Sequence, residues 1–236
     1  MNPTHSGLIG APDNPDLQAP THVGHGVAIT LAAAGILFVL YPAIRPFSDE
    51  TSLAGAGAFA STSWIVAHTL AMAAFVLLTL GLLGLHLRLQ ATSVARWSLR
   101  GLVTSWVGAG LTLPFYGVET FGLAAIGQEV LDRGDSSLLE VAEALRLGTG
   151  LALLVAGLLL LAVGAVMVAA AIWKTQGRLR WSGIPLAIGL ALYLPQFLAS
   201  QPIRIGHGAL MALGCLLVAR TATSTAAHPN GTRNHS

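Results

Sequence analysis

The chain has 236 residues, of which 54% are hydrophobic and only 9% are charged, with a formal net charge of +2. This composition is typical of an integral membrane protein and excludes a soluble core of ordinary make-up. The single cysteine, Cys215, excludes an internal disulfide and any zinc motif built from cysteines. The cations form no basic cluster interleaved with aromatic residues, so nucleic acid is not expected as a partner.

Six long apolar runs dominate the chain, and each approaches or exceeds the about 20 residues that a helix needs to cross the bilayer. The runs are residues 25–44, 64–87, 101–126, 148–173, 182–200 and 202–219. We therefore expect an all-α fold, a polytopic integral membrane protein with a bundle of six transmembrane helices over residues 24–220. Only Gln201 and Pro202 separate the last two runs, which could instead form one bent or re-entrant element.

The distribution of lysine and arginine predicts the orientation of the bundle. With six crossings, the loops after the second and fourth runs fall on one side and carry six Lys and Arg residues without Asp or Glu. By the positive-inside rule, both termini are expected in the cytoplasm. Residues 1–23 and 221–236 are polar and are predicted to be disordered cytoplasmic tails. Arginine far outnumbers lysine and alanine is abundant, which favours a multi-pass protein of a bacterial plasma membrane.

The loop between the third and fourth runs contains a helix signal. Ser137 and Glu140 have the spacing of a capping box, and the apolar residues that follow recur on one face. This pattern predicts either a short amphipathic helix or an early start of the fourth transmembrane helix. Four tryptophans at run boundaries are predicted to lie in the membrane interface: Trp64, Trp97, Trp173 and Trp181.

Small residues in the fourth run predict close helix packing. Gly150, Gly157 and Gly164 recur every seven residues, so one stripe of this helix is bare backbone that a neighbouring helix can approach. The stripe could serve the packing of the bundle itself, a helix of a partner protein or a homo-oligomer.

Glu119 is the carboxylate that lies within an apolar run, where an ionised group costs about 2.5–3.5 kcal/mol at the bilayer centre. Helical spacing places it on one face with small and polar residues, namely Ser105, Gly108, Thr112 and Tyr116. Pro114 removes a backbone hydrogen bond nearby and could kink the helix. Glu119 is expected either to face a pocket inside the bundle or to anchor the helix near the outer interface.

Other polar residues match the depth of Glu119 in the outer half of the bundle. His68 and His207 each lie about one turn inside the outer end of their helix, and Arg204 shares a face with His207 and could pair with Glu119. Tyr193 and Gln196 fall in the same half. Together with Tyr116 and Glu119, these residues predict an outward-facing polar pocket.

Several occupants fit such a pocket. Glu119, Arg204, Tyr116, Tyr193 and Gln196 are candidates for binding a small ligand, with Glu119 as acceptor or proton carrier. His68 and His207 are candidate metal ligands, and with Glu119 they would suit a divalent metal. Met72 and Met211, each four residues after a histidine, would suit copper, and two axial histidines would suit haem. Each histidine could instead have a purely structural hydrogen bond.

Three functions remain open from the sequence, since no motif names a reaction. The leading hypothesis is a binding or transport-related membrane protein that engages a small ligand, proton or metal ion in the outward-facing pocket. A haem- or metal-dependent redox protein or enzyme would need the histidines as ligands, and the sequence leans away from an enzyme. A structural or assembly subunit would need only the glycine stripe and a partner.

Overall fold

The computed structural model describes residues 19–224, of which the side chains are described from Gly24 onward. Every regular element in this range is helical. In chain order the elements are α1 (Ala19–Ile44), α2 (Leu53–Phe59), α3 (Thr62–Leu89), α4 (Ala95–Gly117), the π-helix η2 (Val118–Gly122), α5 (Leu123–Arg133), the 3₁₀ helix η3 (Ser136–Leu138), α6 (Leu139–Leu147), α7 (Thr149–Lys174), α8 (Ile184–Ala191), the 3₁₀ helix η4 (Pro195–Leu198) and α9 (Gln201–Ser224). The all-helical prediction is confirmed for this range.

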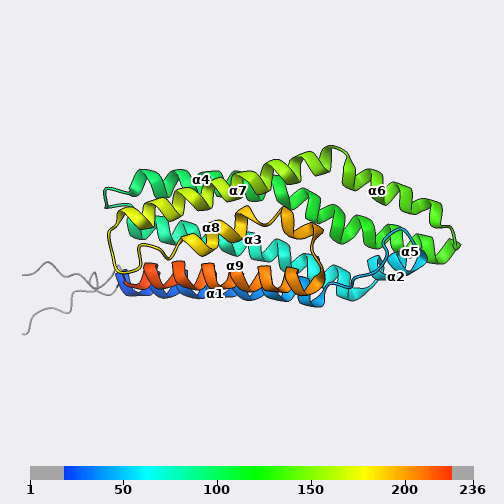
Figure 1. Cartoon of the computed structure of the whole chain (residues 1–236), viewed down its shortest axis with the longest axis horizontal. Coiled ribbons are helices and arrows are strands. Elements are labelled where there is room, and N and C mark those ends of the chain that lie inside the picture. Colours follow the sequence, from blue (N-terminus) through cyan, green and yellow to red (C-terminus); the bar gives the residue numbers. More distant parts are fainter. Residues whose placement is uncertain (1–18, 225–236) are drawn as a thin grey trace, which may run out of the picture.

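Five helices of the described chain are long and apolar enough to cross a membrane: α1, α3, the continuous helix α4–η2–α5, α7 and α9. They lie side by side along the long axis of the molecule (Figure 1). Each of the five helices contains its predicted run or nearly all of it. The helix α4–η2–α5 extends beyond residues 101–126 at both ends, and α1 and α9 extend into the stretches predicted as tails. The rest of both predicted tails lies outside the described residues.

The fifth apolar run does not form one long helix. Its helix α8 has only eight residues and ends at Ala191, and η4 then begins at Pro195. This segment nevertheless runs antiparallel to α9, because Leu186 lies against Gly214 and Gly189 against Met211. The last two runs therefore form the two arms of a hairpin. The prediction that the fifth run forms one continuous helix is wrong, because proline has no N–H to continue the α-helical ladder.

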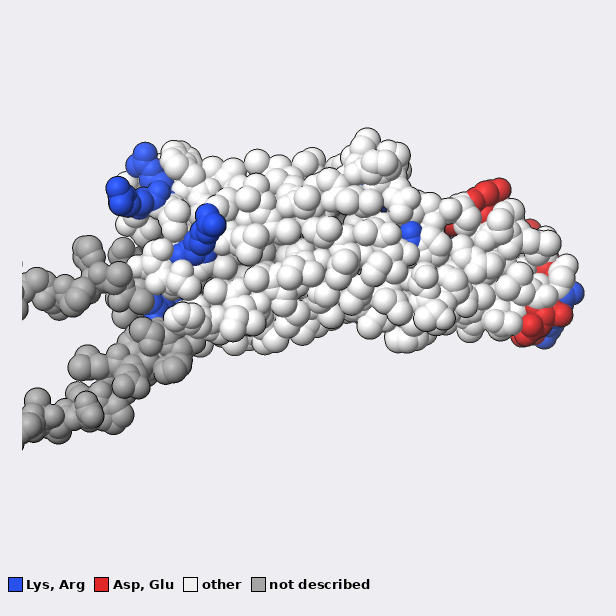
Figure 2. All heavy atoms as spheres, turned by 90° about the horizontal axis from the view of Figure 1, so that it is seen from below, with Lys and Arg blue, Asp and Glu red and all other residues white. Residues whose placement is uncertain are grey.

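The two ends of the bundle differ in charge. The Lys and Arg residues in the last turns of α3 and α7 and in the segments after them gather at the end where α1 begins and α9 ends, which we call the basic end (Figures 1 and 2). Lys174 there stacks on Trp97, with its Nζ 4.2 Å from the ring centroid. Asp and Glu side chains gather at the opposite end, and a broad, almost uncharged band lies between the two ends (Figure 2).

The helices α2, α5 and α6 form a cap at the acidic end of the bundle (Figure 1). The helix α4–η2–α5 has 39 residues and would be about 58 Å long at 1.5 Å per residue, about twice the hydrocarbon thickness. The cap has its own apolar core, which includes Phe59, Trp64, Leu123, Val130 and Ala142. This core holds the cap as a structured layer over the end of the bundle.

The short amphipathic helix predicted in the cap is confirmed as α6. Gly148 separates it from α7 with a backbone that is not helical, so α6 is a distinct helix and the interpretation as an early start of α7 is wrong. The capping box predicted from Ser137 is not formed: the N-cap of α6 is Leu138, without a side-chain hydrogen bond, and the carboxylate of Asp135 caps the preceding η3 by accepting from the N–H of Ser137. Burial of Leu139 and Ala142 orients α6 so that its last turn approaches the bundle.

The glycine stripe packs α7 against α4 within the same chain. A Cβ built on Gly157 would lie 2.7 Å from the carbonyl oxygen of Gly108, and one built on Gly164 would lie 2.8 Å from that of Gly101. Gly150 instead lies near Leu145 of α6. Two of the three glycines thus serve the internal seam between α4 and α7.

This seam predicts that Gly157→Ala destabilises the protein by about 1–3 kcal/mol, because the new methyl group would overlap backbone that cannot move aside. The matched control is Gly110→Ala on α4, where a Cβ would meet no atom within 4 Å. Unfolding by titration of mixed micelles with SDS would measure both free energies. Equal stability of the two variants would contradict the packing described here.

Candidate functional site

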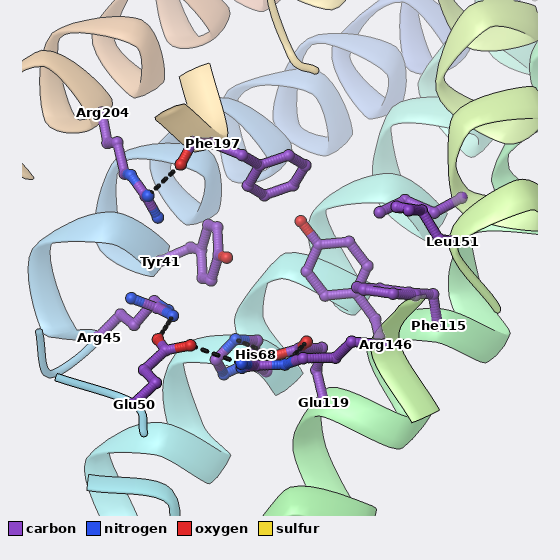
Figure 3. Close-up of a pocket in the computed structure, with 12 residues that line it drawn as sticks. Tyr41, Arg45, Glu50, His68, Phe115, Glu119, Arg146, Leu151, Phe197 and Arg204 are labelled. Carbon is purple, nitrogen blue, oxygen red and sulfur yellow. Dashed lines mark hydrogen bonds and ion pairs between the residues drawn. The ribbon is translucent and has the colours of Figure 1, made fainter. Parts of the chain in front are cut away.

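A cavity of about 270 Å³ lies where the cap meets the bundle. Its wall is charged on one side and apolar on the other (Figure 3). The lining residues are Tyr41, Arg45, Glu50, His68, Phe115, Tyr116, Glu119, Arg146, Leu151, Leu154, Phe197 and Arg204. They come from α1 and the loop after it, α3, α4, η2, α6, α7, η4 and α9. The cavity therefore depends on the packing of both the bundle and the cap.

Glu119 is placed in the wall by the π-helix η2. Pro114 precedes η2 by four residues, and in the wide turn the N–H of Leu123 bonds to the carbonyl of Val118, five residues back. The carbonyl of Glu119 accepts from the indole N–H of Trp64 at 2.6 Å. π-Helical turns within α-helices are frequent at functional sites, and this one aims the carboxylate at the cavity.

The predicted polar face of this helix is confirmed. Ser105, Thr112, Tyr116 and Glu119 are all buried, and Glu119 is only 7% exposed. The carboxylate forms a bidentate pair with Arg146, with Nε to Oε1 at 2.7 Å and Nη2 to Oε2 at 3.0 Å. Two parallel N–H donors are the strongest arrangement for a carboxylate. The pair stabilises the buried charge and also ties α6 to the bundle.

His68 lies on the other side of the same carboxylate. Its Nδ1 donates to the carbonyl of Trp64 at 2.8 Å, because a carbonyl can only accept. Its Nε2 therefore faces Oε2 of Glu119, at 3.7 Å. A proton at this Nε2 would give Glu119 a second cationic partner, so the pair is a place where a proton or a donor group can be held.

Glu50 extends the network toward the loop after α1. One of its carboxylate oxygens accepts from Arg146 and the other from Arg45, each at 2.5 Å. Burial alone would raise the pKa of Glu50, but the two guanidinium groups outweigh it and lower this pKa. Burial likewise opposes the charge of Arg146, yet Glu119 and Glu50 raise the pKa of this guanidinium. Four alternating charges thus neutralise one another: Arg45, Glu50, Arg146 and Glu119.

The Glu50–Arg146 pair also separates the cavity from a second hollow in the cap. This hollow has a volume of about 640 Å³, and both residues line it as well as the cavity. Asp135, Glu140 and Glu143 also line it, so it is acidic. The ion pair is therefore a partition between an acidic outer hollow and the inner cavity.

Arg204 also lines the cavity, but the predicted pair with Glu119 is wrong. Its Nε donates to the carbonyl of Ala199 at 2.9 Å and its Nη2 to that of Phe197, both in the chain just before α9. Its guanidinium carbon lies 5.1 Å from the ring centroid of Phe47. The 3₁₀ turn η4 presents these carbonyls to Arg204, and Arg146 occupies the place beside Glu119.

The other predicted residues lie behind the wall. The hydroxyl of Tyr193 is 3.2 Å from that of Tyr116, which lines the cavity, and Gln196 is buried within η4. His207 donates from Nε2 to the carbonyl of Gly189 at 2.7 Å, and its ring packs on Tyr193. Tyr116 and Glu119 are thus in the wall, whereas Tyr193 and Gln196 are not among its lining residues.

The candidate metal ligands are not brought into one cluster. The described residues contain no group of three or more His, Cys, Asp or Glu side chains that could hold a metal ion. His68 bonds to the carbonyl of Trp64 on its own helix, with the rings of Tyr41 and Trp64 beside it. His207 bonds to the carbonyl of Gly189 on α8. Met211 packs against Gly189. The geometry supports the structural interpretation of each histidine more than a divalent metal, copper or haem.

Sequence reasoning missed Arg146, Arg45 and Glu50, which lie outside the apolar runs. It also placed Trp64 in the membrane interface, whereas its side chain is fully buried between Phe59 and His68. A cation in the last turn of an amphipathic helix was the available signal for Arg146, since that position is favoured by the helix dipole.

Comparisons with families of known proteins, with curated proteins and with solved structures find no match to this chain.

The ion-pair network predicts that Arg146→Gln lowers the free energy of unfolding by about 3 kcal/mol, because Glu119 is left buried and unpaired. The matched control is Arg133→Gln, which removes an exposed i,i+4 pair with Glu129 and should cost less than about 1 kcal/mol. SDS titration of both variants would measure the difference. Equal losses in the free energy of unfolding of the two variants would contradict the role of Arg146 as the partner that stabilises Glu119.

The lowered pKa of Glu50 predicts a loss of stability in acid. A carboxyl group whose pKa falls on folding stabilises the protein at pH values above its ordinary pKa of 4.5. This contribution is lost as the pH falls through the pKa of the group in the folded protein. Glu50→Gln should therefore be less stable at pH 7 and should lose less stability than the wild type between pH 5 and pH 3. Thermal unfolding across this range would measure it, and parallel profiles would contradict it.

Proposed function

We propose that this protein is a bacterial plasma-membrane protein that binds a small ligand in an outward-facing cavity, in a binding or transport-related role. In this proposal the chain crosses the bilayer six times, with the hairpin arm of α8 and η4 as the fifth crossing. The concentration of Lys and Arg at the basic end favours a cytoplasmic location for that end. The cap then lies on the outer side.

The observation that carries the proposal is a cavity lined by ionisable residues at the outer end of an apolar bundle. Ionisable groups at membrane depth are costly, and they usually face a water-filled cavity or a ligand path. A structural tie between cap and bundle would need one ion pair. Here Arg45, Glu50, His68 and Arg204 also face the cavity, next to Glu119 and Arg146 (Figure 3).

The other hypotheses have less support. A redox protein or metalloenzyme needs a ligand set, and the described residues bring no such group together. An assembly subunit needs an outward stripe of small residues, whereas Gly157 and Gly164 face α4 of the same chain. Neither of these hypotheses explains why charged side chains surround a cavity.

The proposal predicts that filling the cavity abolishes ligand binding. Leu151→Trp would occupy the apolar side of the cavity, whereas Leu153→Trp on the outer face of the same helix is the matched control. Four probes would be tested by the thermal unfolding of purified protein: benzoate, phosphate, zinc and tetramethylammonium. Binding to the folded state raises the Tm.

We expect benzoate to raise the Tm of the wild type and of Leu153→Trp by a few degrees and to leave Leu151→Trp unchanged. If no probe shifts the Tm, or if Leu151→Trp responds like its control, the cavity is not a binding site of this kind. A shift by zinc that Leu151→Trp abolishes would favour the metal hypothesis instead.

A further inference from the structure

The three guanidinium groups of the cavity differ in what balances their charge. Arg45 and Arg146 share the carboxylate of Glu50, and Arg146 also pairs with Glu119. Among the described residues, Arg204 is held by two carbonyl oxygens and a ring, with no carboxylate within 4 Å. The three guanidinium groups and the two carboxylates of the cavity wall therefore leave one surplus positive charge, and it belongs to Arg204.

The position of Arg204 in its helix strengthens this surplus. Arg204 is the fourth residue of α9, a helix of 24 residues, so it lies in the first turn, where the helix dipole is positive. Arg45 follows the last residue of α1, and Arg146 lies in the last turn of α6, where a cation is favoured. The helix C-termini near Arg45 and Arg146 stabilise these cations. At Arg204, by contrast, the positive charge of the side chain and the positive end of the helix dipole lie together.

The ring of Tyr41 lies between Arg204 and the ion-paired residues, and its hydroxyl, which has a hydrogen bond with Tyr116, points toward the middle of the cavity (Figure 3). A phenol donates a hydrogen bond, and a guanidinium donates up to five. Of the donors on Arg204, Nε and Nη2 are engaged with carbonyls in the described structure. The Nη1 group and the Tyr41 hydroxyl are suitable partners for an anionic oxygen.

The opposite side of the cavity is apolar. Phe115 and Leu151 lie across from Arg45 and Arg204 (Figure 3), and Leu154 and Phe197 complete this side. The turn η4 forms the wall toward the bilayer: Phe197 faces the cavity, whereas the next residue, Leu198, is 94% exposed. The volume of about 270 Å³ equals that of about nine water molecules, which is room for a small headgroup and part of a chain.

We propose that the cavity binds an amphipathic organic anion, with a carboxylate or phosphate head on Arg204 and Tyr41 and an apolar chain against Phe115, Leu151, Leu154 and Phe197. This inference rests on the proposed function and names its ligand class. A free organic acid and an anionic lipid headgroup share this chemistry. Charge complementarity selects the head, and the apolar side selects the chain.

The test uses the full chain in nanodiscs of phosphatidylcholine and follows thermal unfolding by tryptophan fluorescence. The probes are octanoate, acetate, 1-octanol and octyltrimethylammonium, which separate the contributions of head, chain and charge. We expect octanoate to raise the Tm by about 3–5 °C near saturation, with little change for the other three. An equal rise with octanol or with octyltrimethylammonium would overturn the inference.

Arg204→Gln should remove the octanoate shift, whatever its effect on the Tm without ligand, and Arg204→Lys should keep part of it. Arg220→Gln, at the basic end of the same helix, is the matched control and should keep the full shift. If Arg204 only held η4, the octanoate shift would survive in Arg204→Gln, and the inference would fail.

The source of the anion is distinguished by a second set of nanodiscs. If phosphatidylglycerol alone raises the Tm in an Arg204-dependent manner, the ligand is a lipid headgroup, whereas a response to octanoate only indicates a free acid. A rise with tetramethylammonium that Leu151→Trp abolishes, together with no rise with octanoate, benzoate or phosphatidylglycerol, would leave the proposed function standing and overturn this inference. No response to any probe would contradict both.

Discussion

The buried carboxylate of Glu119 is the constraint on which the rest of the site depends. An ionised group at this depth needs a partner, and the face of α4 and η2 that carries it offers only uncharged residues. The partner comes from the cap, where the last turn of α6 brings Arg146 within 2.7 Å. The cap must therefore fold onto the bundle, and the separate core of the cap, with Phe59 and Trp64, fixes it there.

From this pair the network extends by alternation of charge. Arg146 has more donors than one carboxylate can use, so it also binds Glu50, and Glu50 in turn binds Arg45. The result is a rigid, neutral rim around the cavity. Because these charges cancel, the field inside the cavity is set by Arg204, which is held by the carbonyls of Phe197 and Ala199 and by the ring of Phe47, with no carboxylate among these partners. A wall of this kind can recognise one negative charge without rearranging its own ion pairs.

Much of the fold follows from local features of the sequence. The length and apolar character of the runs predict the long helices, and the 3.6-residue period predicts which face of α4 is buried. The stripe of Gly157 and Gly164 predicts a close seam. The break in the fifth run also had a local signal in Pro195, but an apolar run with a proline can be a kinked helix or a hairpin arm, and packing on α9 decides between them.

The site was less predictable, because its ion pairs join residues that are far apart in sequence. Glu119 has an apparent partner in Arg204 by depth alone, yet depth says nothing of the rotation of α9 or of the carbonyls that η4 provides. Arg146 lies in a segment that reads as a surface helix, and Trp64 reads as an interfacial residue until the cap covers it. The fold of the cap, set by contacts between α2, α5 and α6, was the missing information.

The coupling between Glu119 and Arg146 is the quantity that tests this account most directly. A double-mutant cycle with Glu119→Gln, Arg146→Gln and the double variant, measured by SDS titration, isolates the free energy of their interaction. We expect a favourable coupling of at least about 1.5 kcal/mol, with the double variant more stable than Arg146→Gln alone. A coupling near zero would mean that the two side chains do not pair, and the cap and cavity described here would lose their basis.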